Sequence, residues 1–182
     1  GSSVGFGAVN RFVHELTGVH MTLYVLTDWL SLVPLAFVPG FGLLGLAQWI
    51  RRRDIRKVDR SILALGGFYV AVLAAFLFFE EVVINYRPVL IDGVLEASYP
   101  SSTTMLVMCV MPTAMMQLRA RIKNKVFSRC VMVAIAVFID FMVIGRIVSG
   151  VHWITDIIGG ALFSTAIVLM YYAICNIVTK NR

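Results

Sequence analysis

Charged residues are scarce in this chain of 182 residues. They make up 14% of the sequence, whereas hydrophobic residues make up 59%; a soluble domain is about 25% charged and about 45–50% apolar. The scarcity of charge excludes a water-soluble globule, and the high apolar content excludes an intrinsically disordered chain. The composition therefore predicts an integral membrane protein that forms a single domain, residues 1–182.

Cysteine and acidic residues are also few. The three cysteines, Cys109, Cys130 and Cys175, all lie in apolar segments. An odd number of thiols in such surroundings fits neither a disulfide framework nor a metal centre, so we expect buried free thiols. Ten acidic residues stand against 16 Lys and Arg. In a membrane protein this excess of positive charge is typical of cytoplasmic loops, and no nucleic-acid partner is expected.

Long apolar segments, by contrast, are plentiful. A helix that spans a bilayer needs about 20 residues, and none of the apolar segments alternates as the strands of a membrane barrel do. The predicted fold is therefore all-α, a multi-pass membrane helix bundle with five transmembrane helices. The expected spans are residues 22–50, 61–86, 101–119, 128–149 and 152–179. In the first span, Pro34, Pro39, Gly40 and Gly42 are expected to kink or unwind the helix.

The distribution of basic residues predicts the orientation. Thirteen of the 16 fall in residues 51–60, residues 119–129 and the C-terminal end. Five alternating spans place all three segments on one face, which the positive-inside rule assigns to the cytoplasm. Residues 80–101 and 146–156 then face the outside of the plasma membrane. Residues 4–20 carry apolar side chains at helical spacing, which predicts an amphipathic helix in the interface.

The most informative segment is GRIVSGVHWITD, residues 145–156. It separates Arg146 from His152 by six residues and His152 from Asp156 by four. His152 and Asp156 share a helix face if the last helix has begun, so the carboxylate can hold one imidazole nitrogen and leave the other free to attack. The guanidinium of Arg146 suits bidentate binding of a phosphate. The alternative is that these residues merely cap two helices at the interface.

Two further segments lie at the same predicted level. Arg87 follows the second span in NYRP, and SYPSSTT opens the third span with Ser101, Ser102 and Thr103. A helix N-terminus offers free N–H groups to an anion, although each pattern alone also fits plain helix termination. Together, two guanidiniums, a helix N-terminus and an aspartate-oriented histidine predict a phosphate pocket with a nucleophile.

The order Arg-Pro, then Pro-Ser-x-x, then Arg-x5-His-x3-Asp resembles the type 2 phosphatidic acid phosphatase superfamily over about residues 60–180. These proteins are membrane lipid phosphatases and diphosphatases, usually with six spans, whereas five are predicted here. The resemblance implies that His152 is the nucleophile that forms a phosphohistidine and that Asp156 orients it. It also implies that the phosphoryl oxygens are held by Arg87, Ser101, Ser102, Thr103 and Arg146. It implies no metal and no other cofactor.

Two positions depart from the family pattern. Glu80 stands where the first motif begins with Lys, and Thr103 stands where the second motif ends with the His that protonates the leaving group. A threonine hydroxyl does not deliver a proton near neutral pH, and loss of general acid catalysis costs about 10²–10⁴-fold. A lipid diphosphate releases a phosphate monoester, which departs without strong protonation. The departures therefore favour a polyprenyl diphosphate substrate.

Two other functions stay open. A catalytically impaired family member would bind lipid phosphate or assist a partner in envelope or lipid metabolism. A transporter or channel subunit would use Asp28 and Asp140 as relay residues, although no inverted repeat is visible. The expected partners are a phosphorylated lipid and the lipid bilayer, and a homo-oligomer is also compatible with the sequence.

Overall fold

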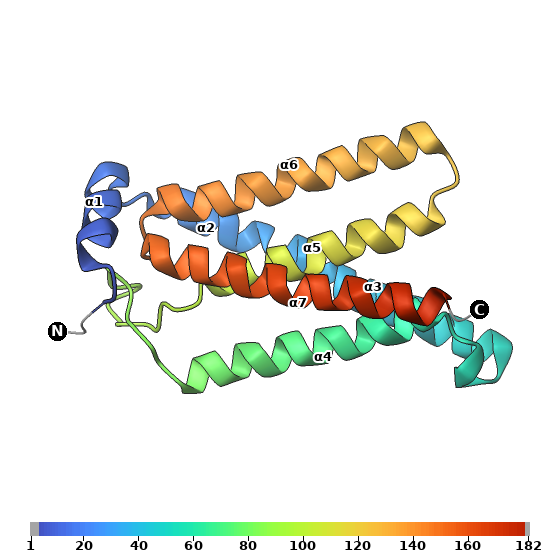
Figure 1. The fold of residues 1–182 in the computed structure, drawn as a ribbon. Coiled ribbons are helices and arrows are strands. Elements are labelled where there is room, and N and C mark those ends of the chain that lie inside the picture. The colour runs from blue at the N-terminus through green and yellow to red at the C-terminus, as the bar shows by residue number, and fades with distance from the viewer. Residues whose placement is uncertain (1–3, 181–182) are drawn as a thin grey trace.

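The computed structural model describes residues 4–180, and the regular elements within them are helices. They are α1 (Gly7–Thr17), α2 (Met21–Leu30), α3 (Leu32–Arg52), the short 3-10 helix η1 (Ile55–Lys57), α4 (Arg60–Glu81), α5 (Ser102–Arg121), α6 (Lys125–Ser149) and α7 (Ile154–Lys180). The long helices lie side by side in a bundle, with α1 across one end (Figure 1). The predicted all-α fold is confirmed.

Four helical segments in the described part of the chain are long and apolar enough to cross a membrane. They are Met21–Arg52, Arg60–Glu81, Lys125–Ser149 and Ile154–Ile177. The chain is therefore a multi-pass membrane protein. The remaining predicted span, residues 101–119, corresponds to α5, which is 20 residues long but less apolar than the others.

Helix α5 lies at the centre of the bundle (Figure 1) and packs against α3, α4, α6 and α7. Its polar side chains are bonded to neighbouring helices. The Thr113 hydroxyl lies 3.3 Å from the Tyr69 hydroxyl, and Gln117 Nε2 donates to the Tyr171 hydroxyl at 2.5 Å. Because other helices cover α5, its polar groups are satisfied inside the protein and need not face lipid.

The first predicted span matches the segment Met21–Arg52, but its helix has a break between α2 and α3. The expected kink at Pro34, Pro39 and the two glycines lies instead at Ser31, between α2 and α3, and α3 runs without a break through Pro39. Pro34 has no N–H, and its ring crowds the carbonyl group four residues earlier, that of Leu30. The helix is therefore interrupted just before the proline. The break leaves Asp28 in the last turn of α2.

The second predicted span is too long. It was expected to run to residue 86, but α4 ends at Glu81 and the chain then forms a loop, residues 82–101. An antiparallel bridge pairs Tyr86 with Ala97 in this loop, and the Arg87 N–H donates to the Glu96 carbonyl at 3.1 Å. The loop, α1 and the turn between α6 and α7 lie at one end of the bundle (Figure 1).

The N-terminal helix is shorter than the predicted residues 4–20, and it is fastened to α7. Asn10 is buried, and its Nδ2 donates to the Thr155 hydroxyl at 2.9 Å. Phe12 and Leu16 are exposed on the same helix, as an interfacial position requires. The three cysteines form no disulfide in the described chain, but only Cys109 is buried; Cys130 is exposed because α6 lies at the outside of the bundle (Figure 1).

Candidate active site

Helix-end signals build the junction between α6 and α7. Gly150 ends α6 with a left-handed backbone (φ 65°), a conformation that costs glycine little. Asp156 is the third residue of α7, and its carboxylate accepts a hydrogen bond from the Trp153 N–H at 3.1 Å. This contact is half of a capping box. His152 therefore lies in the turn between the two helices, with Asp156 in the turn of α7 that follows.

A serine from the loop connects His152 to Asp156. The Ser98 hydroxyl donates to Asp156 Oδ2 at 2.5 Å and lies 3.1 Å from His152 Nδ1. The Ser98 carbonyl lies 3.2 Å from the same nitrogen, and Asn85 Nδ2 donates to Asp156 Oδ1 at 2.8 Å. The spacing of His152 and Asp156 predicted a direct bond. Instead the carboxylate turns back to cap α7, and Ser98 completes the connection.

The contacts of Ser98 fix the tautomer of His152. Because the Ser98 hydroxyl donates its proton to Asp156, it can only accept from the imidazole, and the carbonyl can only accept as well. Nδ1 therefore carries the proton, and the lone pair is on Nε2. Nε2 is buried and has no hydrogen-bond partner among residues 4–180. A buried polar atom without a partner is costly and is suited to meet a ligand.

The surroundings of His152 keep the imidazole neutral. Burial lowers the pKa of His152 well below its usual value of 6.5, and the positive charges of Arg87 and Arg146 lower it further. Both effects disfavour the imidazolium form. The lone pair on Nε2 is therefore available at neutral and at mildly acidic pH.

Arg87 shares a small polar cavity with His152. The cavity has a volume of about 30 Å³, and Glu80, Ser98 and Ser102 also line it. Arg87 Nη2 lies 3.1 Å from a Glu96 carboxylate oxygen, while Nη1 is buried without a partner in the described chain. Two residues that line the cavity, Arg87 and His152, thus each keep a buried nitrogen without a partner in the described chain.

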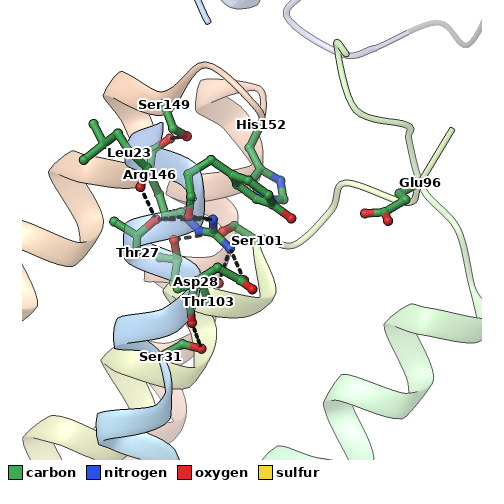
Figure 2. Close-up of polar contacts among 12 residues, drawn as sticks. Leu23, Thr27, Asp28, Ser31, Glu96, Ser101, Thr103, Arg146, Ser149 and His152 are labelled. Atoms are coloured by element: carbon green, nitrogen blue, oxygen red, sulfur yellow. Dashed lines mark hydrogen bonds and ion pairs between the residues drawn. The ribbon is translucent and has the colours of Figure 1, made fainter. Parts of the chain in front are cut away.

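Arg146 is held beside this cavity by α2 and α5 (Figure 2). Only 1% of its side chain is exposed, and its guanidinium donates to Thr27 Oγ1 at 3.3 Å, to Asp28 Oδ1 at 3.3 Å and to Thr103 Oγ1. The Tyr24 ring lies 4.7 Å from the guanidinium carbon of Arg146 and 5.6 Å from that of Arg87. One aromatic ring therefore contacts both cations.

An apolar groove of about 610 Å³ adjoins the polar cavity. Both spaces are lined by Phe76, Ser102 and Met105. The groove also has Asp28 and Thr103 in its wall, and the rest of its lining comes largely from apolar residues of α3, α4 and α5, such as Leu35, Val38, Leu73 and Leu106. A small polar cavity therefore opens beside a larger, mostly apolar groove.

The structure brings most of the predicted site residues together. Arg87, Ser102 and His152 line the cavity, while Arg146 and Thr103 are bonded to each other beside it. Asp156 contacts His152 through the Ser98 hydroxyl. Ser101 is buried, and its hydroxyl accepts from Thr104 at 3.0 Å while its N–H donates to the Asp156 carbonyl at 3.2 Å, so it fastens α5 to α7.

Three residues of the site were missed, and a fourth, Asp28, was named only as a relay residue of a possible transporter. Asn85 and Ser98 stand within or beside the two shorter motifs, where their polar side chains were a usable signal. Tyr24 and Asp28 had no local signal, because Asp28 meets its partner Arg146 at a distance of 118 residues along the chain.

A family model of the PAP2 superfamily matches residues 64–180, which include the loop, α5, the α6–α7 turn and the polar cavity. The chain belongs to the PAP2 superfamily. The resemblance found in the motifs is thereby confirmed, and the family assigns the protein to the membrane lipid phosphatases. A search of the curated proteins gave no match.

Among solved structures, the chain is similar to a transmembrane PAP2-type phosphatidylglycerolphosphate phosphatase from Bacillus subtilis. The TM-score is 0.68 at 16% sequence identity, and the alignment covers 99% of this chain and 90% of that chain. This likeness establishes a shared PAP2 fold over nearly the whole length, including α1, α2 and α3, which precede the segment matched by the family model.

Proposed function

We propose that this protein removes a phosphate from a phosphorylated lipid through a phosphohistidine on His152. The observation that carries the proposal is that His152 and Arg87 line one cavity and that each has a buried side-chain nitrogen without a partner in the described chain, Nε2 and Nη1. Phosphoryl transfer requires a nucleophile that attacks the phosphorus and a positive group that positions the phosphate and stabilises its charge. His152 and Arg87 are of these two types.

The first half of the reaction follows from the tautomer. Nε2 forms a bond to the terminal phosphorus while the bond from phosphorus to the leaving oxygen breaks, and that oxygen departs with the electron pair. Arg87 and Arg146 stabilise the phosphoryl oxygens, together with the N–H groups at the start of α5. The imidazole becomes cationic and keeps its Nδ1 proton. Ser98 connects that charge to the Asp156 carboxylate.

Within the lipid phosphates, we favour a polyprenyl diphosphate. Thr103 accepts a hydrogen bond from Arg146, and a threonine hydroxyl is too weak an acid to protonate a leaving alkoxide near neutral pH. The leaving group of a diphosphate is a phosphate monoester, which needs no such proton. The apolar groove beside the cavity supports a substrate with a long hydrocarbon chain.

A phosphate-release assay in detergent tests the proposal. Polyprenyl diphosphate, phosphatidate and phosphatidylglycerol phosphate are offered separately, and the highest kcat/KM is expected for the diphosphate. Release from a monoester at an equal rate would contradict the leaving-group argument. No release from any of the three by folded protein that still binds vanadate would favour the alternative of a lipid-phosphate-binding protein.

The imidazole of His152 provides a direct measurement. In a chain with His14→Gln and His20→Gln, nitrogen NMR reports His152 alone. We expect a neutral ring with the proton on Nδ1 and a titration midpoint well below pH 6.5, because burial and two arginines disfavour the cation. A midpoint near 6.5, or a proton on Nε2, would contradict the proposed nucleophile.

We further propose that the site faces the outside of the plasma membrane. Residues 51–60 and 119–129 lie at the end of the bundle opposite the site (Figure 1), and both segments are basic, which favours the cytoplasm. Arg182, part of the third basic segment, lies outside the described residues.

Cysteine labelling in cells tests this orientation. Single cysteines are introduced by Ile55→Cys or Val94→Cys in a chain whose native cysteines are replaced by serine; both positions are exposed. An impermeant maleimide added outside is expected to label position 94 and to reach position 55 only after lysis. Labelling of position 55 in intact cells would reverse the orientation.

A further inference from the structure

The second half of the proposed reaction needs a proton acceptor. A water oxygen bonds to the phosphorus, the bond from phosphorus to Nε2 breaks, and its electron pair returns to the imidazole. One proton of the water has to leave as the new bond forms. Thr103 is a poor acceptor because its hydroxyl is a weak base and already accepts a hydrogen bond from Arg146.

The carboxylate of Asp28 lies next to Thr103. Asp28 Oδ1 is 3.3 Å from Arg146 Nη2, and the same nitrogen donates to Thr103 Oγ1. Asp28 and Thr103 therefore approach one another across a single guanidinium nitrogen (Figure 2). The side chain of Asp28 is 59% exposed, and it opens into the groove that meets the His152 cavity at Ser102.

We propose that Asp28 is the general base that takes the proton from the attacking water; this rests on the proposed function. The contact of Oδ1 with Arg146 holds the carboxylate in place, and its oxygens are the proton acceptors that the step needs. The proton then passes from Asp28 to solvent or to the departing inorganic phosphate, and the imidazole regains its lone pair on Nε2 with Nδ1 still protonated. Asp28 thus does the work that an imidazole at position 103 would do.

Glu80 is the rival carboxylate, because it lines the cavity that contains His152 and Arg87. It comes from the last turn of α4, and it makes no ion pair with Arg146 among the described residues. Asp28 is favoured because its carboxylate is bound to the guanidinium that contacts Thr103. A matched pair of variants, Asp28→Asn and Glu80→Gln, separates the two assignments.

The experiment follows the phosphoenzyme with farnesyl diphosphate labelled at its terminal phosphorus. Samples are quenched in alkali, in which a phosphohistidine survives, and the labelled protein and the released phosphate are counted. For Asp28→Asn we expect phosphoenzyme to form at a rate near that of the wild type and then to accumulate. Steady-state release should fall by about 10²-fold or more, the usual loss for a missing general base.

A role limited to holding Arg146 gives a different result. Both formation and turnover would then slow in Asp28→Asn, without accumulation, and the proposal would be overturned. Accumulation in Glu80→Gln but not in Asp28→Asn would also overturn it. Adding Thr103→His to Asp28→Asn places an imidazole beside the phosphoryl group and is expected to restore release.

Two further measurements complete the design. Thermal melting checks that each variant is folded, and Asp28→Glu, which keeps a carboxylate one methylene further out, is expected to accumulate less phosphoenzyme than Asp28→Asn. If Asp28→Glu and Asp28→Asn accumulate equally, the carboxylate is not the base. If an active wild-type protein forms no phosphoenzyme, the phosphohistidine mechanism itself is overturned. This outcome is distinguishable from failure of the Asp28 assignment alone, in which the wild type does form phosphoenzyme.

Discussion

Replacement of His152 by alanine is expected to abolish phosphate release and phosphoenzyme formation. Loss of a covalent nucleophile costs on the order of 10⁴-fold or more in kcat. No other described side chain in the cavity replaces it, since the remaining cavity residues offer hydroxyl, carboxylate, guanidinium or apolar groups. The measurement is steady-state release of phosphate from a polyprenyl diphosphate, together with labelled protein after an alkaline quench.

His20→Ala is the matched control for His152→Ala. His20 is exposed, and its Nε2 contacts the Thr17 carbonyl at 2.9 Å, away from the cavity. We expect its release rate to stay near that of the wild type. Activity in His152→Ala above a few per cent would remove the phosphohistidine mechanism, whereas an equal loss in both variants would indicate a general effect on folding.

Arg87→Gln is expected to lower kcat/KM by about 10²–10³-fold, the usual loss when one preorganised donor to a developing anion is removed. Arg87 is the arginine with unpaired N–H groups in the cavity, whereas the Nη groups of Arg146 already bond to Thr27, Asp28 and Thr103. The assay compares kcat/KM for a diphosphate in the wild type and the variant.

Glu96→Gln is the control for the charge of Arg87. It removes the carboxylate that lies 3.1 Å from Arg87 Nη2 and leaves the arginine in place. In the wild type the Glu96 carboxylate competes with the substrate phosphate for Arg87 Nη2. Because the variant lacks this carboxylate, its KM for the substrate should be modestly lower. A fall of kcat/KM in Glu96→Gln as large as that in Arg87→Gln would show that the ion pair only shapes the loop, and the phosphate would have to bind elsewhere.

The motifs predicted the centre of the site because they are local in sequence. His152 and Asp156 lie four residues apart at the start of α7, and Arg146 lies in the last turn of α6, so a short turn is enough to bring them to the same end of the bundle. The same local rules could not show that Asp156 would turn back to cap α7 and leave Ser98 to contact the imidazole. That choice depends on where residues 82–101 fold.

The contribution of α2 to the site could not be predicted either, because it also depends on packing between segments far apart in the sequence. Asp28 was noted only as a polar residue near a span, because its position against Arg146 depends on the packing of α2 on α6. The break at Ser31 was also placed wrongly. Proline and glycine are a guide to weak points in a helix, but Pro39 is accommodated within α3, while Pro34 interrupts the ladder one turn upstream.

The position of α5 bears on how the protein enters the membrane. A segment with Thr113, Gln117 and several other buried polar residues inserts poorly on its own, since the translocon admits helices according to their apolar content. We therefore expect α5 to be retained beside the translocon until α6 and α7 emerge and cover it. Thr103 begins α5 and His152 joins α6 to α7, so both reach their positions in that same late event. We expect the two halves of the reaction centre to be assembled together during biogenesis, and a chain truncated before α7 to leave α5 accessible to water.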